Sequence, residues 1–331
     1  MKKIAFFDSK LYDKIWFDTI NNKYNYDIHY FENKLNSETA ILARGFDAVI
    51  GFVNDEINKE TIDKLYKNNI RILAMRSAGY NNVDLKAALN KIHVVRVPWY
   101  SPYSIAEHAM ALLLCLNRKI HRAYSRTRDR NFSLNGLTGF DLHGKTVGVI
   151  GTGKIGKVFI DICRGFGVNI LAYDPYPDTN SNINYVSLEE LFKMSDIISL
   201  HCPLTKYTHH IINKDSLSKM KDGVYIINTS RGALIESEDL VDALKTGKVG
   251  AAGLDVYEEE SDFFFEDCSE LIIKDDVLTV LSSMPNVLIT SHQAFLTNEA
   301  LENIARTTLK NLHQFFNNEL LENEVIYKIK D

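Results

Sequence analysis

The chain has 331 residues, of which 45% are hydrophobic and 24% are charged, and its formal net charge is -5. This is the composition of a water-soluble globular protein rather than of a disordered, fibrous or membrane protein. The negative balance argues against nucleic acid as a partner, and the longest apolar run, Ala109 to Leu116, is far shorter than the roughly 20 residues that cross a bilayer.

The length exceeds the roughly 100 to 200 residues of one domain, so two domains are expected. The four cysteines are far apart and form no Cys-x-x-Cys pair. They indicate neither a disulfide framework nor a zinc knuckle, so no metal is expected and a reducing, cytoplasmic location fits best. The basic start of the chain meets Asp8 before the apolar core of a signal peptide could form, and it predicts a first strand instead.

The first hundred residues alternate between short β-branched or aromatic runs and longer amphipathic ones. They predict strands at Ile4–Phe7, Ala48–Phe52, Ile72–Met75 and Val94–Val97, with helices at Asn54–Lys67 and Val83–Asn90. This alternation is typical of βαβ units. A long apolar helical pattern follows from about Tyr103 to Arg122, and its apolar density favours burial against another subunit, hence a homodimer or higher homo-oligomer.

A second series of alternating elements begins at Thr146. Its predicted strands are Thr146–Ile150, Asn169–Tyr173, Ile197–Leu200, Val224–Asn228, Val249–Leu254 and Val287–Thr290. Strands joined by helical crossovers form parallel sheets covered on both faces. After Thr297 a last helical pattern runs to about Asn317 and could fold back onto the first domain. The predicted fold class is α/β, with two doubly wound Rossmann-like domains.

A glycine-rich turn, Gly151-Thr152-Gly153-Lys154-Ile155-Gly156, joins the strand at Thr146–Ile150 to a helical pattern. Gly-x-Gly-x-x-Gly in this context predicts dinucleotide binding, because the turn must be tight, the backbone must approach a pyrophosphate and the helix must pack close to the strand. The helix N-terminus adds N–H groups for that anion. Asp174, 18 residues after Gly156, can accept hydrogen bonds from the adenosine ribose and favours NAD over NADP.

Ligands of open parallel sheets bind outside the carboxyl ends of the strands. There the chain places His201-Cys202-Pro203, Thr229-Ser230-Arg231, Asp255 with Glu260 five residues later, and Ser291-His292-Gln293. We expect the cofactor to lie against His201, Cys202, Pro203, Thr229, Ser230 and Asp255. His209 and His210 lack such a position and are predicted to be surface residues.

One arginine, one acid and one histidine at these strand ends form a candidate catalytic set. The planar fork of Arg231 can bind the carboxylate and polarise the carbonyl group of a 2-oxo acid. Histidine titrates near neutral pH, so His292 can donate the proton that a carbonyl oxygen needs as hydride arrives. Glu260 can orient the imidazole and favour its charged form. Singly, each residue has an ordinary structural interpretation, but their joint position beside a dinucleotide fingerprint favours catalysis.

These motifs resemble those of the D-isomer-specific 2-hydroxyacid dehydrogenases over nearly the whole chain. The resemblance is carried by the glycine-rich turn, His201-Cys202-Pro203-Leu204-Thr205, Asn228-Thr229-Ser230-Arg231-Gly232 and Ser291-His292-Gln293-Ala294-Phe295. The runs Arg76–Asn82, Phe263–Asp267 and Gln293–Phe295 resemble more specifically the members that act on D-lactate. This resemblance implies an Arg–Glu–His mechanism in which NADH reversibly reduces pyruvate to D-lactate.

The resemblance also implies which residues form each domain and what each domain binds. Residues 1–100 with 298–331 would form the substrate domain and residues 101–297 the NAD-binding domain. The active site would lie in the cleft between them, with hinges near Tyr100 and residues 295–298.

A small substrate pocket is implied as well. The substrate carboxylate would lie near the backbone of Ala78 and Gly79, beside Ser77, which stands where such lactate enzymes often carry cysteine. Phe52, Tyr100 and Phe295 would wall the pocket and exclude water and bulky substrates. For Phe52, ordinary core packing is an equally good interpretation.

Three alternatives stay open. An enzyme for a larger 2-oxo acid, such as a 2-hydroxyisocaproate or hydroxypyruvate reductase, would differ by one or two methylenes in its pocket, which discriminate only about 10- to 200-fold. Formate dehydrogenases share the fold, but their reaction needs no proton donor and they typically lack a glutamate like Glu260. NAD-sensing transcriptional corepressors also share the fold, yet we expect no peptide-recruiting extension here.

Overall fold

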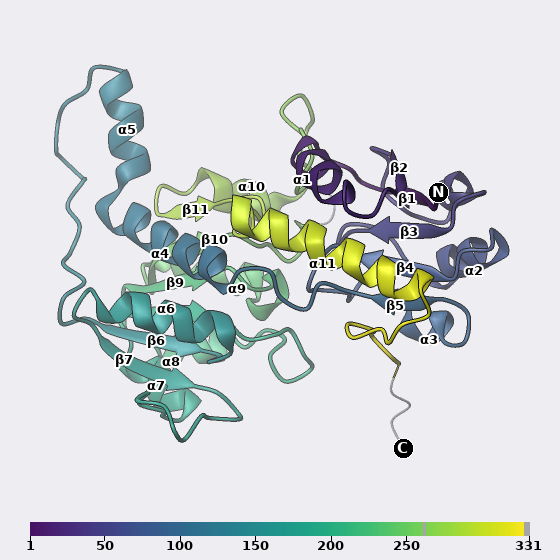
Figure 1. Cartoon of the computed structure of the whole chain (residues 1–331). Helices are drawn as coiled ribbons and strands as arrows, with labels where there is room; N and C mark the ends of the chain where they lie inside the picture. The colour runs from purple at the N-terminus through teal and green to yellow at the C-terminus, as the bar shows by residue number, and fades with distance from the viewer. Residues whose placement is uncertain (261–262, 328–331) are drawn as a thin grey trace. The chain divides into compact units, whose positions relative to one another are not determined.

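The computed structural model of the protein describes residues 1–260 and 263–327. The chain divides into two compact units, Met1–Ser101 with Leu296–Asp331, and Pro102–Phe295. Each unit contains its own parallel β-sheet with helices packed on it (Figure 1). Two parallel sheets of this kind confirm the predicted α/β fold class. Residues 328–331 of the predicted substrate domain lie outside the described residues.

The sheet of the first unit has the strand order β2-β1-β3-β4-β5, with parallel pairing throughout. Its strands are Lys3–Phe6 (β1), Asp27–Tyr30 (β2), Ala48–Gly51 (β3), Ile72–Met75 (β4) and His93–Val95 (β5). The interior strands β3 and β4 are buried along their whole length, as their unbroken apolar sequences require. The edge strand β2 was not predicted from the sequence, because three of its side chains are partly buried, the fourth is exposed, and they show no clear alternation.

The helices of the first unit are Leu11–Asn21 (α1), Thr39–Ala43 (η1, a 3-10 helix), Lys59–Lys67 (α2), Leu85–Ala88 (α3) and Asn298–Phe316 (α11). Helices α2 and α3 are shorter than the sequence pattern predicts, and α1 and η1 were not predicted. Helix α2 begins only at Lys59 because the Asn58 side chain caps it, accepting a hydrogen bond from the Thr61 N–H at 3.0 Å. Helix α11 packs against α1 and β4, so the last helix folds back onto the first part of the chain.

The sheet of the second unit has the order β11-β10-β9-β8-β6-β7 and is parallel throughout. Its strands are Thr146–Ile150 (β6), Asn169–Tyr173 (β7), Ile197–Leu200 (β8), Val224–Asn228 (β9), Val249–Leu254 (β10) and Val287–Ile289 (β11). The chain proceeds from β6 to one side and then returns to the other, so the strand order reverses between β6 and β8. This switch point is where doubly wound sheets bind ligands.

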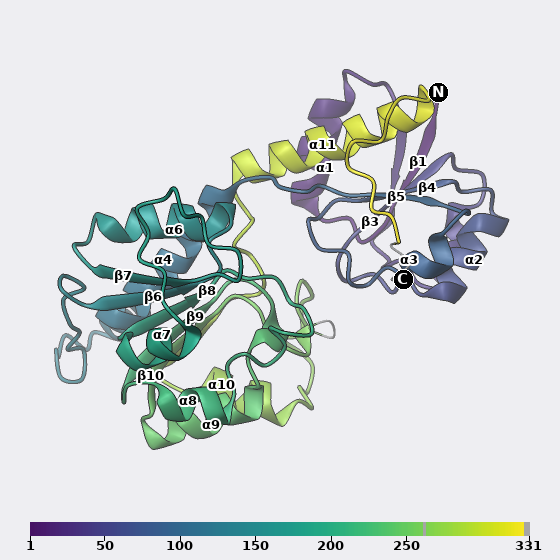
Figure 2. The ribbon, with the colours of Figure 1, turned by 90° about the horizontal axis from the view of Figure 1, so that it is seen from below.

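Helices cover both faces of the second sheet. The helices of this unit are Pro102–Arg118 (α4), Ile120–Arg128 (α5), Lys154–Arg164 (α6), Leu188–Met194 (α7), Lys214–Lys219 (α8), Gly232–Leu234 (η2), Ser237–Thr246 (α9) and Asp276–Ser283 (α10). Figure 2 shows α4 and α6 on one face and α7 to α10 on the other, each above its own hydrophobic cluster. Among the described residues, no helix combines the length and the apolar character that crossing a lipid bilayer requires.

The single long helix predicted from about Tyr103 to Arg122 is wrong. Lys119 takes a left-handed conformation, with φ 50° and ψ 38°, which ends α4 and lets α5 start in a new direction. The apolar residues of α4 pack against α6, β9 and β10 of the same unit. Its apolar density is thus explained within one chain, and α5 buries none of its residues.

Candidate active site

The three glycines of the dinucleotide fingerprint meet three different spatial demands. Gly151 has φ +94°, and a Cβ there would lie 2.7 Å from the backbone of His201 and Cys202. A Cβ at Gly156 would lie 2.0 Å from the carbonyl oxygen of Gly151, so only glycine lets α6 pack on the turn. A Cβ at Gly153 would meet nothing within 4 Å. Gly153 therefore leaves open space at the N-terminus of α6, which fits an approaching pyrophosphate.

Asp174 lies at the carboxyl end of β7 and is bonded to the glycine-rich turn. Its Oδ2 accepts hydrogen bonds from the backbone N–H of Thr152 at 2.8 Å and from the Thr152 hydroxyl at 3.1 Å. The Thr152 hydroxyl also lies 2.9 Å from the Tyr185 hydroxyl, a neighbour that sequence reasoning missed. A carboxylate has about four lone-pair positions, so Asp174 can hold the turn and still accept from a ribose.

The loop after β8 lies against the glycine-rich turn, and several side-chain contacts hold it there. His201 Nε2 lies 2.9 Å from the Ser199 hydroxyl, and its ring centroid lies 4.8 Å from that of Phe159 in α6. Burial lowers the pKa of His201 to about 3, so its imidazole is neutral. Burial likewise raises the pKa of the Cys202 thiol to about 11. The Pro203 carbonyl accepts a hydrogen bond from Thr208 at 2.6 Å, which fixes the loop.

Arg231 follows β9, where the side chain of Asn228 organises the turn. The Asn228 side chain accepts from Ser230 N–H at 3.0 Å and donates to the Arg231 carbonyl at 2.8 Å, while Ser230 Oγ donates to the Cys202 carbonyl at 2.7 Å. The Thr229 hydroxyl is buried without a hydrogen-bond partner among the described residues. A buried, unsatisfied hydroxyl at this sheet edge fits contact with a bound cofactor.

Glu260 and His292 form a hydrogen-bonded pair at the same edge of the sheet. His292 Nδ1 lies 2.9 Å from Glu260 Oε1, and the two side chains are 18% and 19% exposed. Glu260 Oε2 accepts a second hydrogen bond from Tyr257 N–H at 3.1 Å. The carboxylate thus holds the Nδ1 side of the ring, and Nε2 is the nitrogen left to face a substrate.

The backbone around His292 is held by Asp255, which is fully buried. The carboxylate of Asp255 accepts from the N–H groups of Gln293 and Ala294, both at 2.9 Å, and its backbone carbonyl accepts from the His292 N–H at 2.7 Å. His108 on α4 also pairs with Asp255, at 3.3 Å. Asp255 was predicted as a cofactor contact, and here it anchors the loop that carries the candidate proton donor.

An aromatic neighbour of His292 was missed as a site residue by sequence reasoning. The Phe265 ring centroid lies 5.8 Å from that of His292 and 6.5 Å from that of Phe295. The run from Phe263 to Asp267 was recognised only as part of a resemblance, because its sequence gives no indication that the chain returns there to the sheet edge. Phe265 thus lies beside the imidazole of His292.

The predicted carboxylate-binding loop of the first unit follows β4. The Ser77 hydroxyl donates to the Gly79 carbonyl at 2.8 Å, and the Arg96 guanidinium donates to the Ala78 carbonyl at 2.7 Å. The Tyr100 carbonyl accepts a hydrogen bond from the Asn303 side chain at 2.8 Å. These bonds order the loop and the end of the first unit, so the predicted backbone positions are held in place.

Phe52 lies at the end of β3 and is buried. The guanidinium of Arg76, itself buried and paired with Asp13 at 3.3 Å, stacks 4.0 Å from the Phe52 ring centroid. The Phe52 N–H donates to Asp55 at 2.6 Å. Arg76 thus positions Phe52. The sequence indicated Arg76 only as the first residue of the run Arg76–Asn82 and gave it no role of its own.

Comparison with known proteins gives a consistent result along the chain. Residues 110–294 match the family described as D-isomer specific 2-hydroxyacid dehydrogenase, NAD binding domain. The chain is 51% identical to a 2-hydroxyacid dehydrogenase homolog of Haemophilus influenzae, covering 98% of this chain and 99% of the relative. It is 49% identical to the D-lactate dehydrogenase of Escherichia coli, with 98% and 100% covered. A solved structure from work identifying the pyruvate reductase of Chlamydomonas reinhardtii superposes with a TM-score of 0.92 at 43% identity, covering 98% of each chain.

Proposed function

This chain belongs to the D-isomer specific 2-hydroxyacid dehydrogenase family, and on that premise we propose that it is an NAD-dependent D-lactate dehydrogenase. The observation that carries the proposal is the Glu260–His292 pair, with 2.9 Å between Oε1 and Nδ1, on the unit that matches the family's NAD-binding domain. Relatives named for D-lactate and for pyruvate, each covered almost completely, support this choice of substrate.

When bound, NADH supplies the hydride that reaches the carbonyl carbon of pyruvate. The glycine-rich turn at 151–156 and Asp174 would hold the cofactor, together with the loop residues at 201–203, Thr229 and Ser230. The open position at Gly153 and the unsatisfied hydroxyl of Thr229 support this assignment.

The chain's own residues bind the charged substrate and supply the proton. Arg231 binds the substrate carboxylate and polarises its carbonyl oxygen with its planar donors. His292 Nε2 donates a proton to that oxygen as it gains the electron pair of the C=O bond, giving the hydroxyl group of lactate. Glu260 accepts from Nδ1 and stabilises the imidazolium before transfer. In lactate oxidation the same nitrogen takes the proton back.

We propose that the backbone at Ala78 and Gly79, beside Ser77, binds the substrate carboxylate, and that Phe52, Tyr100 and Phe295 limit the size of the 2-oxo acid. The ordered 77–79 loop and the stacking of Arg76 on Phe52 support these positions.

The decisive experiment is a chiral analysis of the product formed from pyruvate and NADH, combined with initial rates for a panel of 2-oxo acids. We expect D-lactate alone, and a higher kcat/KM for pyruvate than for hydroxypyruvate, phenylpyruvate or 2-oxoisocaproate. If one of the larger acids has a higher kcat/KM than pyruvate, that acid is the substrate and the assignment as a D-lactate dehydrogenase is wrong. Formation of L-lactate would contradict the proposal altogether.

We also propose that the enzyme serves fermentation in the cytoplasm and works as a homo-oligomer. The four cysteines are unpaired thiols, two of them buried, which is the state that a reducing compartment maintains. Exposed apolar side chains on α5 and in the segment after it support self-association.

A further inference from the structure

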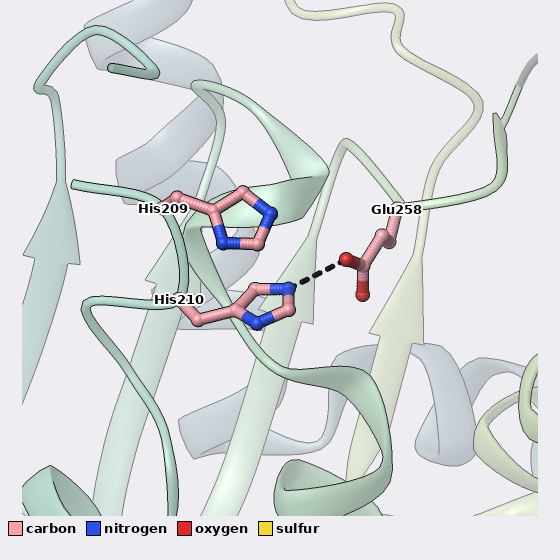
Figure 3. A group of neighbouring side chains, drawn as sticks. All are labelled: His209, His210 and Glu258. Atoms are coloured by element: carbon pink, nitrogen blue, oxygen red, sulfur yellow. Dashed lines mark hydrogen bonds and ion pairs between the residues drawn. The ribbon is translucent and has the colours of Figure 1, made fainter. Parts of the chain in front are cut away.

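Two neighbouring histidines and a glutamate form a cluster on the second unit that the proposed reaction does not use. His209 and His210 lie in the loop between β8 and α8, and Glu258 follows β10. One nitrogen from each histidine and one oxygen of Glu258 all lie within 4.8 Å of one another. Figure 3 shows the two rings next to each other, with centroids 3.8 Å apart and planes tilted by 36°, and His210 Nε2 directed at Glu258 over 2.6 Å. His209 is exposed, as predicted, and the side chain of His210 is partly buried, with 25% of it exposed.

A second carboxylate orients the partly buried histidine of this cluster, His210. His210 Nδ1 lies 2.7 Å from Glu236 Oε2, so Nδ1 carries a hydrogen directed at Glu236 and Nε2 points at Glu258. Histidines that ligate metals almost always donate their other ring N–H to a carboxylate in this way. Glu258 is held in turn, since its Oε2 accepts a hydrogen bond from Ser237 at 3.3 Å.

The backbone of His210 is fixed in an uncommon conformation. Its φ is +49°, in the left-handed region that residues other than glycine seldom adopt. The His210 N–H donates to the Ala233 carbonyl at 2.9 Å, and the His210 carbonyl accepts from the Asn213 side chain at 2.8 Å. The His210 ring is thus positioned from its backbone as well as from both nitrogens, while His209 beside it is exposed to solvent.

We propose that His209, His210 and Glu258 bind a divalent metal ion of the zinc class. Two imidazoles and one carboxylate are a ligand set that Zn²⁺ accepts, with a fourth position open to solvent. With bonds of about 2.0 to 2.1 Å, tetrahedral ligand atoms lie roughly 3.3 Å apart, so rotation of His209 must shorten its distances. Binding replaces the His210–Glu258 hydrogen bond, and its proton passes to solvent. Mg²⁺, which takes oxygen ligands, should not bind here.

The test is calorimetric titration of the full-length, metal-stripped protein with ZnCl₂, repeated for three variants. We expect one Zn²⁺ per chain, at least a tenfold loss of affinity in His209→Gln, and a loss of about 10- to 100-fold in Glu236→Gln, where only the orienting carboxylate changes. His29→Gln, at an exposed histidine of the other unit, is the matched control and should bind like the unmodified protein. Titration with MgCl₂ should give no binding heat.

A spectroscopic readout locates the ion. Co²⁺ bound to nitrogen and oxygen ligands shows only d–d absorption, whereas a cysteine ligand adds a thiolate charge-transfer band. We expect the d–d spectrum alone, and its loss in His209→Gln. Absence of zinc binding, equal affinity in His209→Gln and His29→Gln, or a thiolate band would each overturn the proposal. His209 is exposed, so its replacement leaves folding intact and decides the matter even if Glu236→Gln unfolds.

Discussion

At the scale of single residues, the most constrained side chain of the candidate site is His292. Its φ is +52°, in the left-handed region that residues other than glycine adopt infrequently. The buried carboxylate of Asp255 compensates by bonding the two following N–H groups, and Glu260 fixes the ring. A proton donor benefits from this rigidity, because transfer requires a fixed distance to the substrate oxygen.

Replacing His292 by asparagine tests this role while respecting the left-handed backbone. We expect kcat to fall by about 10²- to 10⁴-fold, the usual contribution of a general acid, while the dissociation constant for NADH stays nearly unchanged. Steady-state kinetics and NADH fluorescence titration measure the two quantities. Glu260→Gln, which keeps a hydrogen-bond acceptor, should lose less activity. Normal turnover in His292→Asn would exclude it as the proton donor.

His201 gives a pH dependence of stability with a definite sign. Its pKa is lowered from 6.5 to about 3 by burial, so below pH 6.5 the unfolded chain binds a proton that the folded chain does not. The unfolding free energy therefore falls as the pH decreases from 6.5 towards 3, by at most about 1.4 kcal/mol per pH unit. Urea unfolding of the native chain and of His201→Asn between pH 7 and pH 5 should show the difference between them shrinking towards acid. A constant difference would contradict the assignment.

At the scale of elements, the glycine-rich turn between β6 and α6 combines a structural and a binding demand. A Cβ at Gly151 or Gly156 would overlap backbone atoms, whereas a Cβ at Gly153 would meet no atom within 4 Å. One six-residue motif thus contains positions that serve folding and a position that serves the ligand.

Two alanine substitutions separate these demands. Gly153→Ala should leave thermal stability nearly unchanged and weaken NADH binding at least tenfold, because only a ligand would meet the new methyl group. Gly156→Ala should lower the melting temperature, since its Cβ would lie 2.0 Å from the Gly151 carbonyl oxygen. Scanning calorimetry without cofactor and NADH titration measure both effects. Equal loss of stability in the two variants would show that Gly153 is structural too.

At the scale of the whole molecule, the surface that we propose for self-association differs from the one expected from the sequence. The predicted surface was the apolar helix now seen as α4, which packs within its own unit. Helix α5 and the segment after it extend away from the sheet of the second unit (Figure 1). They expose Tyr124 at 60% and Leu134 at 79%, and exposed apolar surface of this kind supports our proposal that a second copy binds here.

Substitution of this arm tests the oligomer. The double change Tyr124→Ser and Leu134→Ser should raise the dissociation constant of the oligomer at least tenfold, equivalent to about 1.4 kcal/mol. Sedimentation velocity over a concentration series measures it. Leu320→Ser, at a residue 83% exposed in the first unit, is the control and should sediment like the native chain. If the native chain sediments as a monomer, the proposed homo-oligomer is wrong.

The sequence alone determined the features that rest on local pattern. Short-range rules predict the strands of the second sheet, because buried parallel strands consist of apolar runs. They also predict the glycine-rich turn and Asp174, because a turn that binds a pyrophosphate needs glycines at set spacings and an acid about 20 residues further on. The convergence of Glu260 and His292 could also be predicted, because residues after successive parallel strands meet at one sheet edge.

Only the tertiary structure decided which groups hold these residues in place. Asp255 as an anchor, Phe265 beside His292, Arg76 stacked on Phe52 and the two carboxylates around His210 all join positions far apart in the chain. Single-residue conformations, such as the left-handed Lys119 that divides α4 from α5, are likewise chosen by packing. Periodicity records which face of an element is buried, but carries no information about which distant side chain will meet it.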